Sequence, residues 1–394
     1  MKNNKFKSTV NACFIAYIVQ AIVNNFAPLL FVTFQKEFDI ELSKITLLVT
    51  FNFLIQLTVD LLSAKFIDKI GYRTSMVLAH ILSAAGLISL AVLPSIMKNS
   101  FAGLIISVMI YAIGGGILEV LVSPIVEACP TDNKEKAMSL LHSFYCWGHV
   151  LVVLLSTLFF NLFTISNWRI TAVIWAIVPI ANAIVFTKVP ITPLIEENEK
   201  GMSIKELISS KLFITLFIMM VCAGASEQAV SQWASAFASE GLGIPKTVGD
   251  LAGPLTFAVL MGTSRAIYGK YGDRLPQQKA IPLCSVLCII SYLMISLSPL
   301  PALSMIGCAL SGFSVGIMWP GTFSLSAKKL PKGSTAMFAL LALGGDLGCS
   351  AGPSLVGFVS SNAGNNLKIG ILTALVFPIL LLISTLSLRK SNSQ

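Results

Sequence analysis

Long apolar runs separated by short polar segments make up most of this 394-residue chain. Each run has about 20 residues or more, the length that an α-helix needs to cross the hydrocarbon core of a bilayer. Some runs contain proline, such as Pro124 and Pro320, which membrane helices tolerate better than soluble ones do. The pattern predicts twelve transmembrane helices, over residues 9–33, 44–66, 74–96, 101–126, 136–163, 167–188, 210–238, 248–268, 278–299, 302–326, 334–360 and 365–388.

The composition supports a chain that is surrounded by lipid. Hydrophobic residues make up 55% of the sequence and charged residues 11%, whereas soluble domains carry roughly 25% charged residues. So few charges cannot cover a surface that faces water. We therefore expect an all-α membrane protein whose partners are the lipid bilayer and a small molecule.

The basic residues are distributed unevenly between the loops. Twelve spans place both termini on one side of the membrane, and that side holds 21 of the 27 Lys and Arg residues, against six on the other. The positive-inside rule therefore predicts cytoplasmic termini in a multi-pass protein of the cell membrane. Because orientation explains the net charge of +9, we do not expect a nucleic-acid partner, which would require a basic stripe.

The longest polar stretch, residues 189–209, lies near the middle of the chain and includes Glu196 and Glu197. It is predicted to be a cytoplasmic linker with a short amphipathic helix at Ile204–Ser209. The linker would separate an N-terminal six-helix bundle, residues 1–188, from a C-terminal one, residues 210–394.

The two halves share a repeated pattern. The loop after the second span contains Ala64-x3-Asp68-Lys69-x-Gly71-x-Arg73, and the loop after the eighth contains Gly269-x3-Asp273-Arg274. Gly116 and Pro124 in the fourth span have the same spacing as Gly312 and Pro320 in the tenth. Internal repeats of this kind are typical of transporters.

This loop motif resembles the signature of the major facilitator superfamily, G-x3-D-R-x-G-x-R/K. The first copy departs from it at Ala64 and Lys69, and the second has Leu275-Pro276 where the family prefers x-Gly. The resemblance extends over essentially the whole chain. It implies two pseudo-symmetric six-helix bundles around a central cavity that opens alternately to each side of the membrane.

A narrower resemblance is to the fucose permease branch of that family. It rests on Gly116-Ile-Leu-Glu119-x4-Pro124, Leu141-His142-Ser143-Phe144-x3-Gly148, Gly224-Ala-Ser-Glu227-x5-Trp233 and the pair Asn24-Asn25. The permease carries an acid shortly after its Asn pair, where this chain has Pro28. The resemblance implies uptake of a sugar. It also implies two protonatable sites for proton coupling, and this chain lacks the one that Pro28 replaces.

Ionisable groups inside apolar helices are candidates for function because each costs roughly 2.5–3.5 kcal/mol to insert. Glu119 lies deep in the fourth span and matches the acid of the permease branch. We expect it to carry a proton or to accept a hydrogen bond from a sugar hydroxyl. The alternative is a structural hydrogen bond inside the N-terminal bundle.

A larger set of polar side chains is predicted to bind the solute. Gln20 and Asn24, like Gln228 and Gln232, share a helix face at a spacing of four residues. Amides and carboxylates can bind hydroxyl groups, and a Trp ring offers a flat apolar surface; the alternative is hydrogen bonding between helices. The predicted binding residues are Gln20, Asn24, Asn25, Glu119, His142, Glu227, Gln228, Gln232 and Trp233.

Two further residues are candidates for proton coupling with Glu119. His149 lies seven residues after His142, so the two share nearly one face of the fifth span and either could relay protons; the alternative is packing. Asp346, in Gly344-Gly345-Asp346-Leu-Gly348, could be a second protonation site or pair with a buried polar group. Two His without a third ligand do not predict a metal site.

Charged residues near the loop motifs are predicted to control gating. Asp60 and Arg265 lie 205 residues apart, each four residues before its motif, and would form either an ion pair between the halves or two separate anchors. The remaining charges would hold cytoplasmic helix ends together, and they are Asp68, Arg73, Asp273 and Arg274.

No catalytic chemistry is expected. Residues 312–316 fit G-x-S-x-G, but a hydrolase elbow requires a strand–turn–helix context, and this segment lies in an apolar span. The sequence contains no P-loop for binding ATP. We therefore expect a proton gradient to drive transport, without a cofactor.

The leading hypothesis is therefore a secondary active transporter that takes up a small polar solute, most simply a sugar, by proton symport. By analogy it would work as a monomer. One alternative is an efflux antiporter of the same fold, which would have a more aromatic cavity. Another is a membrane receptor or an intramembrane enzyme, which would need a large soluble domain or a catalytic constellation.

Overall fold

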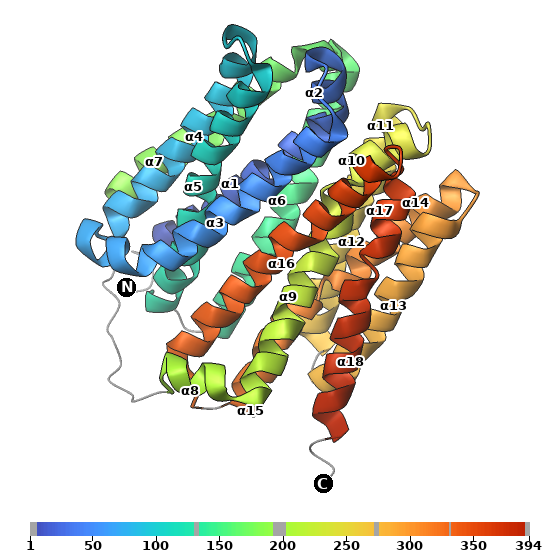
Figure 1. Cartoon of the computed structure of the whole chain (residues 1–394). Coiled ribbons are helices and arrows are strands. Elements are labelled where there is room, and N and C mark those ends of the chain that lie inside the picture. Colours follow the sequence, from blue (N-terminus) through green and yellow to red (C-terminus); the bar gives the residue numbers. More distant parts are fainter. Residues whose placement is uncertain (1–5, 130–133, 192–201, 272–275, 331, 391–394) are drawn as a thin grey trace. The chain divides into compact units, whose positions relative to one another are not determined.

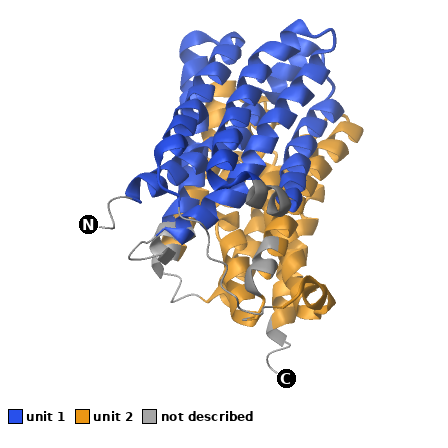
Figure 2. Cartoon of the chain, turned by 90° about the vertical axis from the view of Figure 1, so that its left-hand side faces the viewer, with its two compact units in different colours: residues 1–196 blue, residues 197–394 orange. Residues whose placement is uncertain are grey.

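The computed structural model describes residues 6–129, 134–191, 202–271, 276–330 and 332–390. Every element assigned within these ranges is a helix (Figure 1). The chain divides into two compact units, Met1–Glu196 and Glu197–Gln394, which are coloured separately in Figure 2.

The first unit begins with a helix that is interrupted near its middle, and continues with five long helices. Its elements are α1 (Lys7–Asn25), η2 (Ala27–Leu30), α2 (Phe31–Phe38), α3 (Leu42–Ile70), α4 (Tyr72–Ile96), α5 (Ser100–Ala128), α6 (Lys134–Phe163), η3 (Ile165–Asn167) and α7 (Trp168–Lys188).

The second unit has more interruptions within its apolar runs. Its elements are α8 (Ile204–Ser209), α9 (Lys211–Ser231), α10 (Ala234–Ala236), η4 (Phe237–Gly241), α11 (Lys246–Asp250), η5 (Leu251–Leu255), α12 (Thr256–Tyr271), α13 (Gln277–Leu297), α14 (Pro301–Val315), α15 (Met318–Lys329), α16 (Ser334–Asn362), α17 (Leu367–Thr373) and α18 (Val376–Lys390).

Helical segments occupy all twelve ranges that hydropathy predicts. Among the described residues, ten helices or helix pairs are long and apolar enough to cross a membrane. The two other predicted spans are 248–268, which is divided among α11, the π-helix η5 and the 16-residue α12, and 334–360, which coincides with the 29-residue α16. The chain is an all-helical membrane protein, consistent with twelve spans.

The helices of the two units pack in the same order. In the first unit α1 packs against α5, α6 and α7, while α4 packs against α5 and α7. In the second unit α9 packs against α14, α16 and α18, while α13 packs against α14 and α18. The pair α3 and α5 corresponds to α12 and α14. The repeat in the sequence is therefore also a repeat in helix packing.

Outward-facing side chains show why these helices need an apolar surrounding. On α7, Ile170, Ile177 and Ile184 lie seven residues apart and are 52%, 59% and 55% exposed. The opposite side of the same helix buries Trp175 and Asn182. A stripe of exposed isoleucines on one face suits contact with acyl chains.

Two glycines at equivalent places in the repeat allow close helix contact. A Cβ atom at Gly116 would lie 3.1 Å from the Cα of Gln56 in α3. A Cβ atom at Gly312 would lie 2.2 Å from the carbonyl oxygen of Phe257 in α12. Because the neighbouring atoms belong to the backbone, they cannot move aside as a flexible side chain can. The glycines therefore set the spacing of the α3–α5 and α12–α14 pairs.

We expect Gly312→Ala to lower the stability of the second unit by roughly 1–3 kcal/mol, the usual cost of overpacking. Gly321→Ala is the matched control, because its Cβ would meet only the side chain of Ile281, at 3.3 Å. The measurement is the thermal unfolding midpoint of each purified variant. Equal midpoints for the two variants would show that the α12–α14 contact has room for a Cβ atom at residue 312.

The short helix predicted at Ile204–Ser209 is confirmed as α8. Its capping box explains why it begins there: the Ser203 hydroxyl accepts from the backbone N–H of Glu206, and the Glu206 carboxylate accepts from the backbone N–H of Ser203. These hydrogen bonds lower the pKa of Glu206. The cap therefore stabilises α8 above the unfolded pKa of Glu206 and is lost as pH falls through the folded one. Glu196 and Glu197 lie outside the described residues.

Candidate functional site

A chain of buried amide groups joins three helices of the first unit. Asn24 of α1 accepts two hydrogen bonds at its Oδ1 atom, from Asn52 Nδ2 at 3.1 Å and from Gln56 Nε2 at 2.8 Å. One turn earlier on α1, Gln20 Nε2 donates to Glu119 Oε2 of α5 at 2.7 Å. Both Gln20 and Asn24 are buried, 3% and 5% exposed. The predicted residues Gln20, Asn24 and Glu119 therefore belong to one polar cluster.

Small residues on α5 position Glu119 in this cluster. A Cβ atom at Gly115 would lie 3.2 Å from Val23 of α1, and one at Gly116 would lie against Gln56 of α3. Larger residues there would push α5 away from both helices. Because Glu119 follows these glycines by about one helical turn, their close packing brings its carboxylate to the polar faces of α1 and α3.

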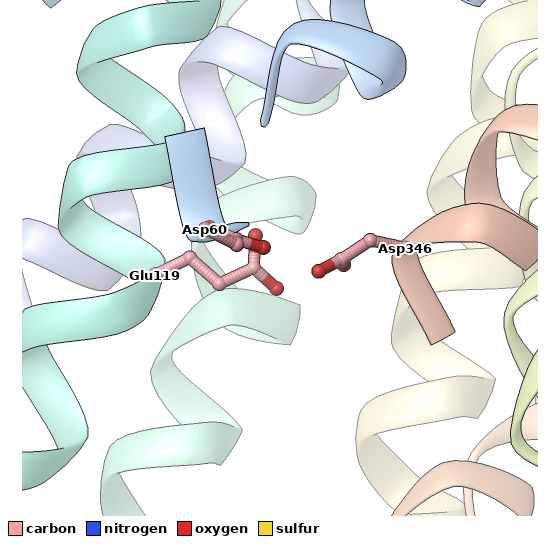
Figure 3. A group of neighbouring side chains, drawn as sticks. All are labelled: Asp60, Glu119 and Asp346. Carbon is pink, nitrogen blue, oxygen red and sulfur yellow. The ribbon is translucent and has the colours of Figure 1, made fainter. Parts of the chain in front are cut away.

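Asp60 completes the cluster from α3. It follows Gln56 by four residues and therefore lies on the same helix face. A carboxylate oxygen of Asp60 and one of Glu119 lie within 4.8 Å of each other, and Figure 3 shows the two carboxyl groups side by side. Asp60 does not lie at the end of its helix, because α3 continues through the loop motif to Ile70.

Asn25 and the two predicted histidines have other surroundings within the first unit. The amide of Asn25 donates to the carbonyl of Ala21 at 2.9 Å and to the hydroxyl of Tyr145 in α6 at 3.4 Å. His142 is exposed, and its ring centroid lies 5.4 Å from that of Tyr17. His149, on the same helix, is buried at 2% exposed. The two histidines therefore have different surroundings in spite of their shared helix face.

Asn52 and Gln56 are polar residues of the cluster that the sequence analysis missed. Together with Asp60 they repeat every four residues along α3, the same spacing that identified Gln20 and Asn24 on α1. A search for this periodicity within apolar spans would have found them. A second missed group joins Asn182 of α7, whose Nδ2 lies 2.8 Å from His80 Nε2 of α4.

The second unit contains a buried ion pair. Arg265 Nη2 of α12 lies 3.2 Å from Glu227 Oε2 of α9, with side chains 16% and 9% exposed. Arg265 Nε also donates to the carbonyl of Gly316 at 3.0 Å. That carbonyl lies at the break between α14 and α15, where helical hydrogen bonding is interrupted. The predicted pair between Asp60 and Arg265 would join the two units and stays a prediction.

Amide groups extend from the ion pair along α9. Gln228 Nε2 donates to Glu227 Oε1 at 3.3 Å, and Gln232 Nε2 donates to Gln228 Oε1 at 2.9 Å. Trp233 is fully buried, and its indole N–H donates to the carbonyl of Pro353 in α16 at 2.9 Å. The structure thus brings Glu227, Gln228 and Gln232 together with Arg265, while the indole N–H of Trp233 is used in helix packing.

Asp346, labelled in Figure 3, lies on α16 and is 4% exposed. The glycines around Asp346 permit close helix contact. A Cβ atom at Gly348 would lie 2.0 Å from the carbonyl oxygen of Val221 in α9, and one at Gly345 would lie 2.1 Å from the Trp319 ring. Asp346 is therefore held on a helix whose neighbours are packed tightly against its backbone.

One of the predicted gating residues outside these clusters has a described contact. Arg73 Nη1 of α4 donates to the carbonyl of Phe186 near the end of α7 at 2.8 Å. This hydrogen bond ties α4 to α7, as a residue that holds helix ends together should do. The side chains of Asp68, Asp273 and Arg274 lie outside the described residues.

The two clusters share one chemical character. Each combines buried amides with a carboxylate inside helices that are otherwise apolar, and the second adds a guanidinium group. Such groups can donate to and accept from a hydroxylated or charged solute, and a carboxylate can take up a cation or a proton.

Comparison with solved structures shows the fold. A variant of the E. coli fucose:proton symporter FucP is 17% identical, with a TM-score of 0.66 over 97% of this chain and 98% of that one. A D-xylose-proton symporter is 11% identical, with a TM-score of 0.75 over 97% of each chain. A bacterial homolog of the human lysosomal transporter Spinster is 13% identical, with a TM-score of 0.74 over 98% of this chain and 97% of that one.

No curated protein matches the sequence. The sequence model of the Major Facilitator Superfamily, however, matches residues 12–390, nearly the whole chain. This match agrees with the repeated packing of the two units and with the structural likenesses above. The chain belongs to the Major Facilitator Superfamily, a family of membrane transporters.

Proposed function

We propose that this transporter takes up a small polar solute, a sugar, by proton symport. The observation that carries the proposal is the cluster of Gln20, Asn24, Asn52, Gln56 and Glu119, which holds four amides and a carboxylate inside apolar helices. Burying polar groups in a membrane protein is costly. A hydroxylated solute would use these donors and acceptors, whereas helix packing alone needs far fewer of them.

The similarity to solved structures supports the same proposal of sugar uptake with protons. Two of the solved structures are described as symporters of fucose and of D-xylose with protons. Their identities, 17% and 11%, limit the comparison to the fold, so the solute and the ion of this chain rest on its own residues. Glu119 is the proposed proton carrier, and Asp346 and His149 are further candidates.

The orientation follows from charge. With both termini in the cytoplasm, the loops richest in Lys and Arg face the cytoplasm, as the positive-inside rule requires. We propose a monomer that is driven by the proton gradient and has no cofactor. The alternative, an efflux antiporter of the same fold, is disfavoured by the amide-rich cluster of the first unit, because a pocket for apolar compounds would be lined mainly by aromatic side chains.

Thermal unfolding of the purified chain in the presence of sugars, nucleosides, carboxylates and apolar drugs tests the proposal. A solute that binds only the folded state raises stability by about 2.7 kcal/mol at a concentration of 100 times its Kd. We expect a sugar to raise the unfolding midpoint, and Asn24→Ala to remove that rise, because Asn24 links α1 to two amides of α3.

The matched control for this measurement is Asn362→Ala, since Asn362 is exposed near the end of α16 and its amide donates only locally, to Phe358. It should keep the full response to the sugar. Stabilisation by apolar drugs and by no sugar would favour the efflux antiporter instead.

A further inference from the structure

The short helix α8 has an exposed apolar face. Ile204 and Ile208 share one side of this helix at a spacing of four residues, and they are 56% and 55% exposed. Leu207 points elsewhere and is fully buried, and α8 packs against α9 and α16 of its own unit. Large apolar side chains on one face of a helix within a polar stretch are typical of helices that lie in a membrane interface.

α8 lies where the lipid-facing surface of α9 begins. The backbone N–H of Met202, just before α8, donates to the carbonyl of Lys332 at 2.8 Å. The chain turns at Ser210, where the backbone is extended, and then enters α9. Ile214 and Ile218, in the first two turns of α9, are also exposed. Figure 1 shows α8 at the same end of the second unit as the start of α9 and the end of α15. The exposed face of α8 thus adjoins an apolar surface that needs lipid around it.

The charges at this end of the second unit favour an anionic partner. Exposed lysines occur in and beside α8, namely Lys205, Lys211 and Lys332. Residues 276–345 contain no Asp or Glu, and the Glu206 carboxylate of α8 is already hydrogen-bonded to Ser203 in the helix cap. Clustered lysines next to an apolar helix face match the headgroups of anionic phospholipids, which attract basic residues to the membrane surface.

We propose that α8 is an interfacial anchor that docks on an anionic phospholipid surface at this end of the second unit. Ile204 and Ile208 enter the boundary between headgroups and acyl chains, and the amino groups of the three lysines contact lipid phosphates. Long lysine side chains can reach the headgroups from such a position. The anchor fixes the beginning of α9, the helix that carries Glu227. It does not depend on which solute the protein transports.

Site-directed spin labelling tests whether α8 contacts lipid. All eight native cysteines are buried, so a cysteine introduced at an exposed position is labelled selectively. In vesicles of phosphatidylcholine and phosphatidylglycerol, a label on Ile208→Cys should collide with oxygen, which concentrates in lipid, more often than with a water-soluble nickel chelate. Ser209→Cys, at an exposed position on the polar side of α8, is the matched control and should show the opposite preference.

A label at position 208 that meets the nickel chelate as often as the label at position 209 does would overturn the proposal. In that case α8 faces water or a soluble partner. The result leaves the proposed uptake of a sugar untouched, because the solute is tested by its own effect on thermal unfolding.

A lipid titration tests the preference for anionic headgroups. The purified chain in neutral detergent is unfolded thermally with increasing phosphatidylglycerol or phosphatidylcholine. We expect phosphatidylglycerol to raise the midpoint to a plateau, as a ligand of the folded state does, and phosphatidylcholine to raise it less. The double variant Lys205→Gln with Lys332→Gln should need at least ten-fold more phosphatidylglycerol for half the effect, since each lysine contributes roughly five-fold.

The matched control for the titration is Lys44→Gln with Lys98→Gln, which removes the same charge from exposed positions of the first unit. Without lipid, both double variants should unfold at the wild-type midpoint because the lysines that they replace are exposed. Only the α8 variant should lose the response to phosphatidylglycerol. Equal effects of the two lipids on the wild type, or equal losses in the two double variants, would overturn the assignment of the lipid site to α8.

Discussion

Replacing Arg265 with Met should lower the stability of the chain by about 3–5 kcal/mol, the usual cost of removing one partner of a buried ion pair. The change leaves the Glu227 carboxylate, whose side chain is 9% exposed, without the guanidinium that lies 3.2 Å away. It also removes the donor to the Gly316 carbonyl. For a unit of this size the unfolding midpoint should fall on the order of 10 °C, measured by thermal unfolding of the purified protein.

Two further variants show whether the unpaired charge is the cause. The double variant Arg265→Met with Glu227→Gln should recover part of the loss, because it replaces the carboxylate with a neutral amide. Lys279→Met, at an exposed lysine of α13, should leave the midpoint within about 0.5 kcal/mol of the wild type. An unchanged midpoint for Arg265→Met would mean that this ion pair contributes nothing to the fold.

Replacing Glu119 with Gln should abolish the dependence of uptake on external pH. The side chain keeps its size and can still accept from Gln20, but it can no longer release a proton. We expect uptake of the identified solute to fall roughly ten-fold at acidic external pH. This fall corresponds to a rise of about 1.4 kcal/mol in the activation free energy of transport. The measurement is the initial rate of uptake into proteoliposomes with and without a pH gradient.

Solute binding and a matched variant complete this experiment. If the carboxylate of Glu119 serves proton coupling alone, the solute should still raise the unfolding midpoint of Glu119→Gln. The matched control is Glu41→Gln, whose uptake should depend on pH as that of the wild type does. Uptake by Glu119→Gln that still follows the pH gradient would remove Glu119 from the coupling role and leave Asp346 and His149 as the candidates.

Hydropathy alone predicted where the helices lie, because a bilayer imposes a minimum length on each apolar run. It could not predict the breaks. Gly316 and Ile317 interrupt the tenth span between α14 and α15, and the π-helix η5, which contains Pro254, interrupts the eighth. Both segments are as apolar as their neighbours, so only the packing and hydrogen bonding around them distinguish a break from a continuous helix.

The polar residues of the candidate site were partly predictable from spacing. Gln20 and Asn24 were found because they repeat every four residues, and Asn52 and Gln56 follow the same rule but were missed. The partner of Arg265 was not predictable, because the repeat relates Arg265 to Asp60 by position, whereas contact depends on which helices touch. Within the second unit α9 presents Glu227 to α12, and a single sequence does not reveal that juxtaposition.

The first long helix of each unit is interrupted just after its polar residues. α1 ends at Asn25, and η2 begins after Phe26; α9 ends at Ser231, and α10 begins after Gln232 and Trp233. Such an interruption is a place where a helix can bend, because the regular i to i−4 hydrogen bonding stops there. The residues before it, which carry the hydrogen bonds of Gln20 and Glu227, therefore belong to a different rigid segment from the residues after it.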